Sequence, residues 1–219
     1  MPTARDLVHP GVVAPSLDDV VARTPARLTP RWLSLFVRAC FEQLGRADDR
    51  VAALGMTPAA VLDHLTGAPT RRDLGRVSFG SMALADVAAA AACVTGDAAA
   101  WAIVHSYEPL VRQALAGVPG ESHPALAART FFQQIREATE SDSASSLNLR
   151  RYSGERPLRV WLVDRVLGTH AHEIRGPRNR AVIDRRLRLA LENLDSQREH
   201  VRAVVGLPPA VAVDRLLTD

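Results

Sequence analysis

Apolar residues recur at helical spacing along most of the chain, and prolines and glycines divide them into segments. The clearest run follows Thr29 and Pro30, a cap and first-turn pair, and Gly45 ends it. No stretch alternates apolar and polar residues around a Gly-Asn or Asn-Gly turn. The pattern therefore predicts an all-α fold. The apolar positions of that first run are Leu33, Phe36, Val37, Cys40, Phe41 and Leu44.

Caps and prolines predict several further helices. Thr57 and Pro58 begin a short helix that Gly67 ends, and residues 68–80 are expected to form a connecting loop. An alanine-rich helix is expected from about Met82 to Thr95. A further helix is expected to be capped by Asp97 and interrupted by Pro109 near Tyr107. The next helix begins at Pro124 and is followed by a mobile loop at Ser141–Ser146. The last two predicted helices are one that begins at Pro157 and a long one over residues 179–205.

Composition is typical of a packed globular protein. Of the 219 residues, 47% are hydrophobic and 23% are charged, which excludes a disordered or collagen-like chain. The longest apolar stretch, 82–104, contains Asp86 and Asp97, so no membrane span is expected. Cys40 and Cys93 lie in apolar helical patterns and predict two buried thiols of a reducing compartment. With no signal-peptide pattern at the N-terminus, a cytoplasmic location is expected.

Charge is concentrated in one part of the sequence. All 27 basic residues are arginines, and residues 150–188 hold eleven of them against four acids, a net charge of +7. The rest of the chain carries a net charge of −4. Such a cluster is either a solvated helix face or the electrostatic footprint of a polyanion site.

Two motifs resemble region 2 of the sigma-70 family, especially sigma factors of the extracytoplasmic-function type. The first joins the Gly96-Asp97 helix start to the break at Tyr107-Glu108-Pro109-Leu110-Val111. The second reads Tyr-Ser-Gly-Glu-Arg-Pro-Leu-Arg-Val-Trp-Leu over residues 152–162. The similarity covers roughly residues 85–200. It implies a helical domain that docks on bacterial RNA polymerase core and captures the melted, single-stranded minus-ten promoter element.

The resemblance and the residue chemistry together give candidate contacts. Unpaired DNA exposes base faces and phosphates, so cations and planar side chains are needed to bind it. Tyr152 precedes a glycine turn, so it is either the candidate for base stacking or a side chain that packs against the start of the next helix. Trp161 is expected to be core. The predicted DNA-binding residues are Arg150, Arg151, Tyr152, Arg156, Arg159 and Arg165. Polymerase contacts are expected from Gln133, Arg136 and Glu137.

Two departures from the family keep a second interpretation open. In the helix that begins at Pro124, residues 125–134 lack the family's acidic residues. Residues 187–204 resemble the entry to region 4, and residues 205–219, with two adjacent prolines, are not expected to complete a helix-turn-helix. The alternative is a degenerate sigma-fold interaction protein, the partner or target of an anti-sigma factor or of a stress- or defence-associated protease. A nonspecific nucleic-acid binder is a third reading. The predicted segments are an N-terminal helical extension (1–80), the region 2-like domain (81–176) and a C-terminal segment (177–219).

Catalytic and cofactor signatures are not apparent. The sequence has no Gly-x-Ser-x-Gly elbow, Walker loop or His-Glu-x-x-His motif, so no enzyme activity and no cofactor are expected. His170 and His172 lie two positions apart and would diverge on a helix, so no metal site is expected there. On the helix that begins at Pro30, the face of Trp32, Leu35 and Phe36 is expected to be core or a docking surface for a regulator.

Overall fold

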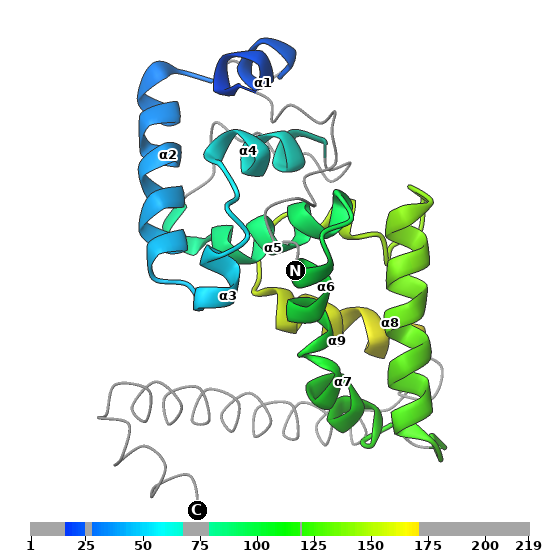
Figure 1. Cartoon of the computed structure of the whole chain (residues 1–219). Helices are drawn as coiled ribbons and strands as arrows, with labels where there is room; N and C mark the ends of the chain where they lie inside the picture. Colours follow the sequence, from blue (N-terminus) through cyan, green and yellow to red (C-terminus); the bar gives the residue numbers. More distant parts are fainter. Residues whose placement is uncertain (1–15, 25–27, 68–78, 119, 171–219) are drawn as a thin grey trace, which may run out of the picture. The chain divides into compact units, whose positions relative to one another are not determined.

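The computed structural model describes residues 16–24, 28–67, 79–118 and 120–170, and within them every regular element is a helix (Figure 1). The all-α prediction is therefore confirmed. The predicted segment 177–219, the helix over 179–205 and most of the loop 68–80 lie outside the described residues. The elements are α1 (Leu17–Arg23), α2 (Pro30–Gly45), α3 (Asp49–Ala52), α4 (Pro58–Gly67), η2 (Phe79–Ser81), α5 (Leu84–Val94), α6 (Ala98–His105), α7 (Glu108–Leu115), α8 (Pro124–Glu140), η3 (Leu149–Arg151) and α9 (Leu158–Thr169).

The predicted helix boundaries are set by the expected caps. Thr29 Oγ1 accepts a hydrogen bond from the Trp32 N–H at 3.2 Å, and α2 ends at Gly45. At the start of α6, Asp97 Oδ1 accepts from the backbone N–H groups of Ala99 and Ala100. The interruption predicted near Tyr107 is also present, because α6 ends at His105 and α7 begins at Glu108.

The chain falls into two compact units. Described residues of the first unit are 16–24, 28–67, 79–106 and 133–161, and those of the second are 107–118, 120–132 and 162–170. The first unit thus includes helices from the predicted N-terminal extension together with α5 and α6. The three segments expected from the sequence stay a prediction, because they follow the family resemblance, whereas the two units follow the contacts within the structure.

Helix α5 is the centre of the first unit, and α2, α4, α6 and η3 all pack against it. Its side chains are buried on nearly every side, from Leu84 through the alanines to Cys93. A helix that is apolar all round needs neighbours on all its faces, and alanine lets those neighbours approach closely. Cys40 and Cys93 are both buried free thiols, as predicted.

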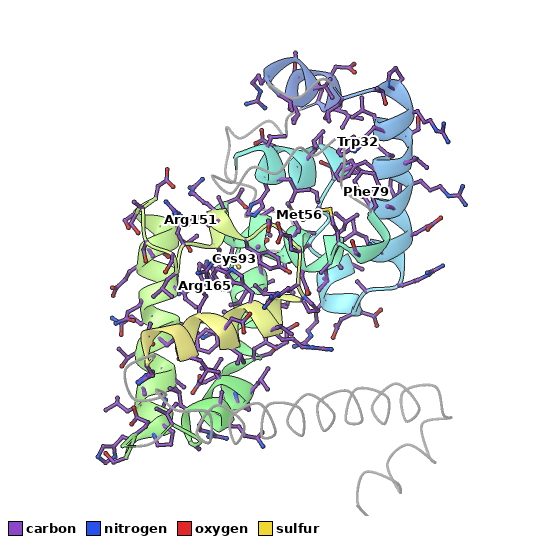
Figure 2. All side chains as sticks on the ribbon, turned by 180° about the vertical axis from the view of Figure 1, so that it is seen from behind. Trp32, Met56, Phe79, Cys93, Arg151 and Arg165 are labelled. Carbon is purple, nitrogen blue, oxygen red and sulfur yellow. The ribbon has the colours of Figure 1, made fainter. Side chains whose placement is uncertain are left out.

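An aromatic cluster joins α2 to the 3-10 turn η2. Trp32 and Phe36 stack with 5.4 Å between ring centroids, and Phe79 meets both rings edge-on at 4.8 and 5.6 Å. Trp32 and Phe79 are labelled in Figure 2. Trp32 and Phe36 are therefore core, whereas Leu35 is 50% exposed and lies outside the core. The alternative docking role of this face stays a prediction. Gln43 links α2 to η2 and to the start of α5, because its amide group donates to the Phe79 carbonyl and its side-chain oxygen accepts from the Leu84 N–H.

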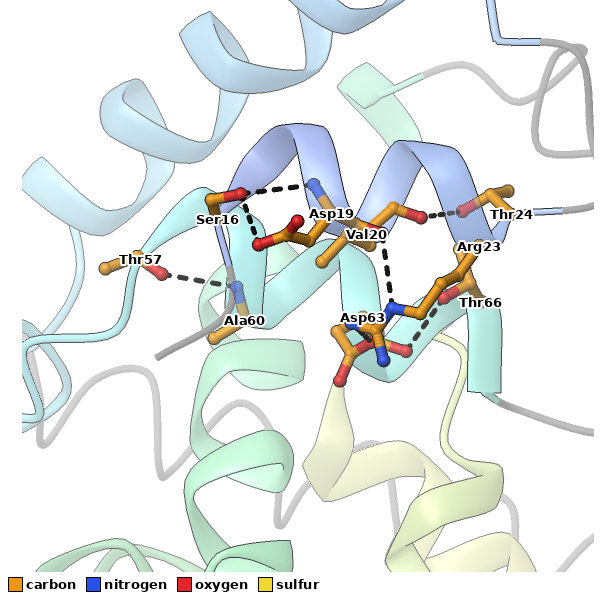
Figure 3. A network of polar contacts seen from close by, with 9 residues as sticks. All are labelled: Ser16, Asp19, Val20, Arg23, Thr24, Thr57, Ala60, Asp63 and Thr66. Atoms are coloured by element: carbon orange, nitrogen blue, oxygen red, sulfur yellow. Dashed lines mark hydrogen bonds and ion pairs between the residues drawn. The ribbon is translucent and has the colours of Figure 1, made fainter. Parts of the chain in front are cut away.

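Helix α1 was not predicted, although its capping pattern is in the sequence. Ser16 Oγ accepts from the Asp19 N–H at 3.1 Å, the contact expected of a serine followed three positions later by an acid. The helix packs against α4, where Arg23 pairs with Asp63 at 3.0 Å (Figure 3). The four-residue helix α3 was also missed.

In the second unit, α7 packs on the later part of α9 through a small apolar cluster. Leu110, Ala114 and Val163 are buried together, and Leu167 packs against them. Polar support comes from an ion pair of 3.7 Å between Arg129 and Glu108, both partly exposed to solvent. Such a pair adds little stability, so apolar burial holds this unit together.

Candidate nucleic-acid interface

Two arginines of the candidate site follow a buried asparagine cap. Asn148 is 2% exposed, and its Oδ1 accepts from the Arg150 N–H at 2.9 Å. The Leu149 N–H donates to Thr139 Oγ1 at 3.0 Å, which ties the turn to the end of α8. These bonds fix the backbone of η3 and so determine where Arg150 and Arg151 emerge.

The segment after η3 is anchored on α5 at two points. The Ala83 N–H donates to the Gly154 carbonyl at 2.9 Å, and the Leu158 N–H donates to Asp86 Oδ2 at 2.8 Å. Gly154 has φ +72°, and a Cβ there would lie 2.5 Å from Val87 Cγ2. The glycine in the motif is thus required both by backbone conformation and by space, and the first turn of α9 receives its acceptor from another helix.

Tyr152 does not occupy the position predicted for it. Its ring is 1% exposed and meets Trp161 edge-on at 5.8 Å, while its hydroxyl donates to the Arg156 carbonyl at 2.6 Å. A base can stack only on an accessible ring face. The stacking role expected of Tyr152 is therefore wrong for this conformation, because the ring is part of the core and orders the turn from inside.

The predicted DNA-binding arginines differ in their surroundings. Arg150 is partly buried, and its Nε lies 3.2 Å from Asp142 Oδ1. Arg151, labelled in Figure 2, is partly buried and has no ion pair within the described residues. Arg156 is exposed and Arg159 is partly buried, and both interact with other groups of the protein. These four belong to the first unit, whereas Arg165 lies further along α9 in the second unit.

A histidine from α4 contacts this segment from the side of the protein core. His64 Nε2 lies 3.0 Å from the Tyr152 carbonyl oxygen. Burial lowers the pKa of His64 to about 4, and the charge of Arg150 acts in the same direction. The Tyr152 carbonyl and the Asp63 carboxylate oppose that shift. The neutral ring is therefore a fixed structural support of the segment at neutral pH.

The residues expected to contact polymerase lie together on the exposed side of α8. Gln133 Nε2 donates to Glu137 Oε1 at 2.8 Å, and Arg136 pairs with Glu140 at 2.7 Å. The Arg136 guanidinium also lies over the buried ring of Trp101, 5.7 Å from its centroid. A partner that used Arg136 would compete with these contacts. The predicted polymerase role itself stays a prediction.

Sequence reasoning missed two residues of this region, His64 and Asp142. His64 lies 88 positions from Tyr152, in a helix assigned to the extension, so no local pattern joins them. Asp142 lies in the stretch 141–146, which was expected to be a mobile loop. Here that stretch is a hydrogen-bonded turn, since Ser143 Oγ accepts from the Ser145 N–H and Asn148 Nδ2 donates to the Ser143 carbonyl. Ser145 Oγ accepts from the Leu147 N–H, just beyond the stretch.

No group of three or more His, Cys, Asp or Glu residues in the described part of the chain could hold a metal ion. Among the same residues, no helix is both long enough and apolar enough to cross a bilayer. No protein-family model, curated protein or solved structure matches the chain. The sigma-factor resemblance therefore depends on the two motifs alone.

Proposed function

We propose that the chain is a sigma-like transcription initiation factor that binds bacterial RNA polymerase and the melted minus-ten promoter strand. The observation that supports this most is the fixed backbone of the segment that carries Arg150 and Arg151. Both follow the buried Asn148 cap, on a segment that Gly154 and Asp86 attach to α5. Cations held in place before binding lose little conformational entropy when they contact phosphates.

The burial of Tyr152 changes how the strand would be held. Without an accessible tyrosine ring, affinity comes mainly from guanidinium contacts to the phosphate backbone. Binding should then depend strongly on salt, and only weakly on base identity at the position that an exposed tyrosine would have contacted. Arginine side chains can also stack on bases, so Arg151 and Arg156 are the residues best placed to replace the missing ring.

The direct test measures association with polymerase core and capture of a promoter strand. The wild-type chain should bind purified core polymerase at low salt, and the complex should retain a labelled non-template oligonucleotide. Arg151→Ala should weaken strand binding and reduce the magnitude of its salt slope by about 0.7. Arg112→Ala is the matched control, an exposed arginine of α7 with no ion pair among the described residues. Absence of any complex with core polymerase would contradict the proposal.

A degenerate interaction protein is the second candidate, and the buried Tyr152 is the observation that favours it. A chain whose tyrosine is buried and whose residues 125–134 lack the family's acids could keep the helical scaffold for a regulatory partner. Affinity capture with purified candidate proteins would then recover an anti-sigma factor or a protease and no polymerase subunit. Equal affinity for promoter and unrelated strands would instead indicate nonspecific nucleic-acid binding.

A further inference from the structure

The turn that follows helix α8 contains a residue in the left-handed conformation that is not glycine. Asp142 has φ +48° and is the sole non-glycine residue of positive φ in the described ranges. The Ser143 N–H donates to the Ala138 carbonyl at 3.0 Å, and the Asp142 N–H donates to the Thr139 carbonyl at 3.4 Å. These two bonds form a Schellman motif, whose left-handed position is normally glycine. Any L-residue in this conformation costs free energy, although Asp and Asn tolerate it better than most.

The charge of Asp142 is also unfavourable at this place. A helix C-terminus carries partial negative charge, so a cation is preferred there and a carboxylate is disfavoured. The last turn of α8 has no basic residue, and its acids Glu137 and Glu140 already interact with Gln133 and Arg136 from the preceding turn. Backbone conformation and helix electrostatics therefore both disfavour an aspartate at this position.

The compensation comes from the arginine site. Asp142 Oδ1 lies 3.2 Å from Arg150 Nε and accepts a longer hydrogen bond, 3.4 Å, from Asn148 Nδ2. The same amide group donates to the Ser143 carbonyl at 2.9 Å, and Asn148 Oδ1 caps Arg150. One buried asparagine thus aligns the carboxylate with the arginine. A residue that violates two local rules and makes one specific contact is a candidate for function.

The contact between Asp142 and Arg150 is incomplete. Arg150 Nε has almost no solvent contact, yet it donates no well-aligned hydrogen bond within the described residues. The side chains of Arg150 and Asp142 are 40% and 70% exposed, so solvent screens the pair. An oxyanion arriving from solvent could bind the same guanidinium with better geometry, and breaking the existing pair would cost little.

We propose that the Asp142 carboxylate is an internal substitute for a phosphate. In the unbound protein it pairs with the Arg150 guanidinium, and a phosphodiester of single-stranded DNA displaces it. The proposal depends on the function proposed above for the arginine segment. The carboxylate oxygen stands where a phosphate oxygen would bind. Asp142 therefore keeps Arg150 oriented, lowers the affinity for any polyanion, and restricts binding to strands that make further contacts.

The test compares charge-removing variants of the full chain. Asp142→Asn keeps an amide of the same shape that tolerates left-handed backbone, and Asp142→Gly supplies the residue that the Schellman motif prefers. Both variants should fold. Binding is measured by fluorescence anisotropy with a single-stranded oligothymidylate over a range of salt concentrations. Asp49→Asn is the control, because it makes the same charge change at an exposed position with no described arginine partner.

Both Asp142 variants should bind the oligonucleotide about two- to five-fold more tightly than wild type, the range expected when one exposed ion pair no longer competes. The salt slope should stay close to that of the wild type, because the phosphate contact of Arg150 forms in both proteins and Asp142 only competes with it. Asp49→Asn should show no such gain. In the double variant Asp142→Asn/Arg150→Ala the gain should disappear, because the arginine that it depends on is missing.

Other outcomes would overturn the proposal in distinguishable ways. Unchanged affinity of Asp142→Asn, together with weaker binding by Arg150→Ala and Arg151→Ala, would leave the arginine site intact and remove the role of Asp142. An equal gain in affinity for Asp142→Asn and Asp49→Asn would mean that the gain comes from the change in net charge and not from the Asp142–Arg150 contact. No binding by any form of the chain would contradict both this proposal and the DNA-binding function on which it depends.

Discussion

His64 Nε2 lies 3.0 Å from the backbone carbonyl oxygen of Tyr152 and joins positions 88 apart in the sequence. Because a carbonyl can only accept, Nε2 carries a proton, and burial of the ring, which lowers its pKa to about 4, keeps the imidazole neutral at neutral pH. The contact ties α4 to the segment that presents Arg150 and Arg151. Helix α4 is thus part of the support of the arginine segment.

Stability should fall on acidification because of His64. Burial lowers its folded pKa to about 4 from an ordinary value of 6.5. Between these values the unfolded chain binds a proton that the folded chain does not, so the free energy of unfolding decreases as pH falls from about 6.5 to about 4. The full loss is about 3 kcal/mol. Urea denaturation at several pH values between these limits measures it.

His64→Gln supplies the control for that pH dependence. Glutamine keeps a donor for the Tyr152 carbonyl but does not titrate, so the variant should lose only the part of the pH dependence that His64 contributes. Carboxylates and the other histidines titrate in both proteins and cancel in the comparison. Identical pH profiles for the two chains would show that His64 is protonated as readily in the folded protein as in the unfolded one.

Gly154→Ala should destabilise the first unit by about 2–4 kcal/mol, since it combines a left-handed residue with overpacking. The new Cβ would lie 2.5 Å from Val87 Cγ2, at the place where the Gly154 carbonyl accepts from Ala83. Thermal unfolding measures the loss. Gly96→Ala is the matched control, because Gly96 also has positive φ, +84°, but nothing lies within 4 Å of its Cβ position. Equal losses in the two variants would show that the Val87 contact adds nothing.

Helices were predictable where local chemistry marks their ends. Thr29 caps α2, whose first residue is Pro30, and Asp97 caps α6. Helix α1 begins at Ser16 with an equally local signal, but its short apolar pattern gave too little periodicity to be recognised. The division into two units was not predictable, since it depends on which helices share a core and not on breaks in the sequence.

The candidate site was less predictable than the helices. Local charge identified Arg150 and Arg151, but whether a tyrosine faces solvent depends on tertiary packing. Tyr152 follows a turn and has a polar hydroxyl, features that fit an exposed ring as well as a buried one. In the structure the Tyr152 ring is buried because its hydroxyl donates to the Arg156 carbonyl and its ring packs edge-on against Trp161. The pairing of Asp142 with Arg150 could not be predicted either, since it depends on how α8 ends.

Tyr152→Phe should lower the free energy of unfolding by about 1 kcal/mol, the net contribution of the hydrogen bond from its hydroxyl to the Arg156 carbonyl. The phenylalanine ring keeps the edge-on contact with Trp161, so affinity for a single strand should not change. Denaturant titration and strand binding are measured on the same preparation. A fall in affinity with unchanged stability would mean that the hydroxyl faces the strand and is not bonded inside the protein.

Asp86→Ala should loosen the start of α9 without unfolding the protein. The carboxylate accepts from the Leu158 N–H at 2.8 Å, and its loss leaves that donor without this acceptor, at a cost of about 1–2 kcal/mol. Amide hydrogen exchange should become faster across Leu158–Trp161. Asp97→Ala removes an equivalent cap from α6 and should accelerate exchange at Ala99 and Ala100 instead. If Asp86→Ala left exchange at the start of α9 unchanged, the helix would be held by its apolar contacts alone, and α5 would not determine where Arg159 lies.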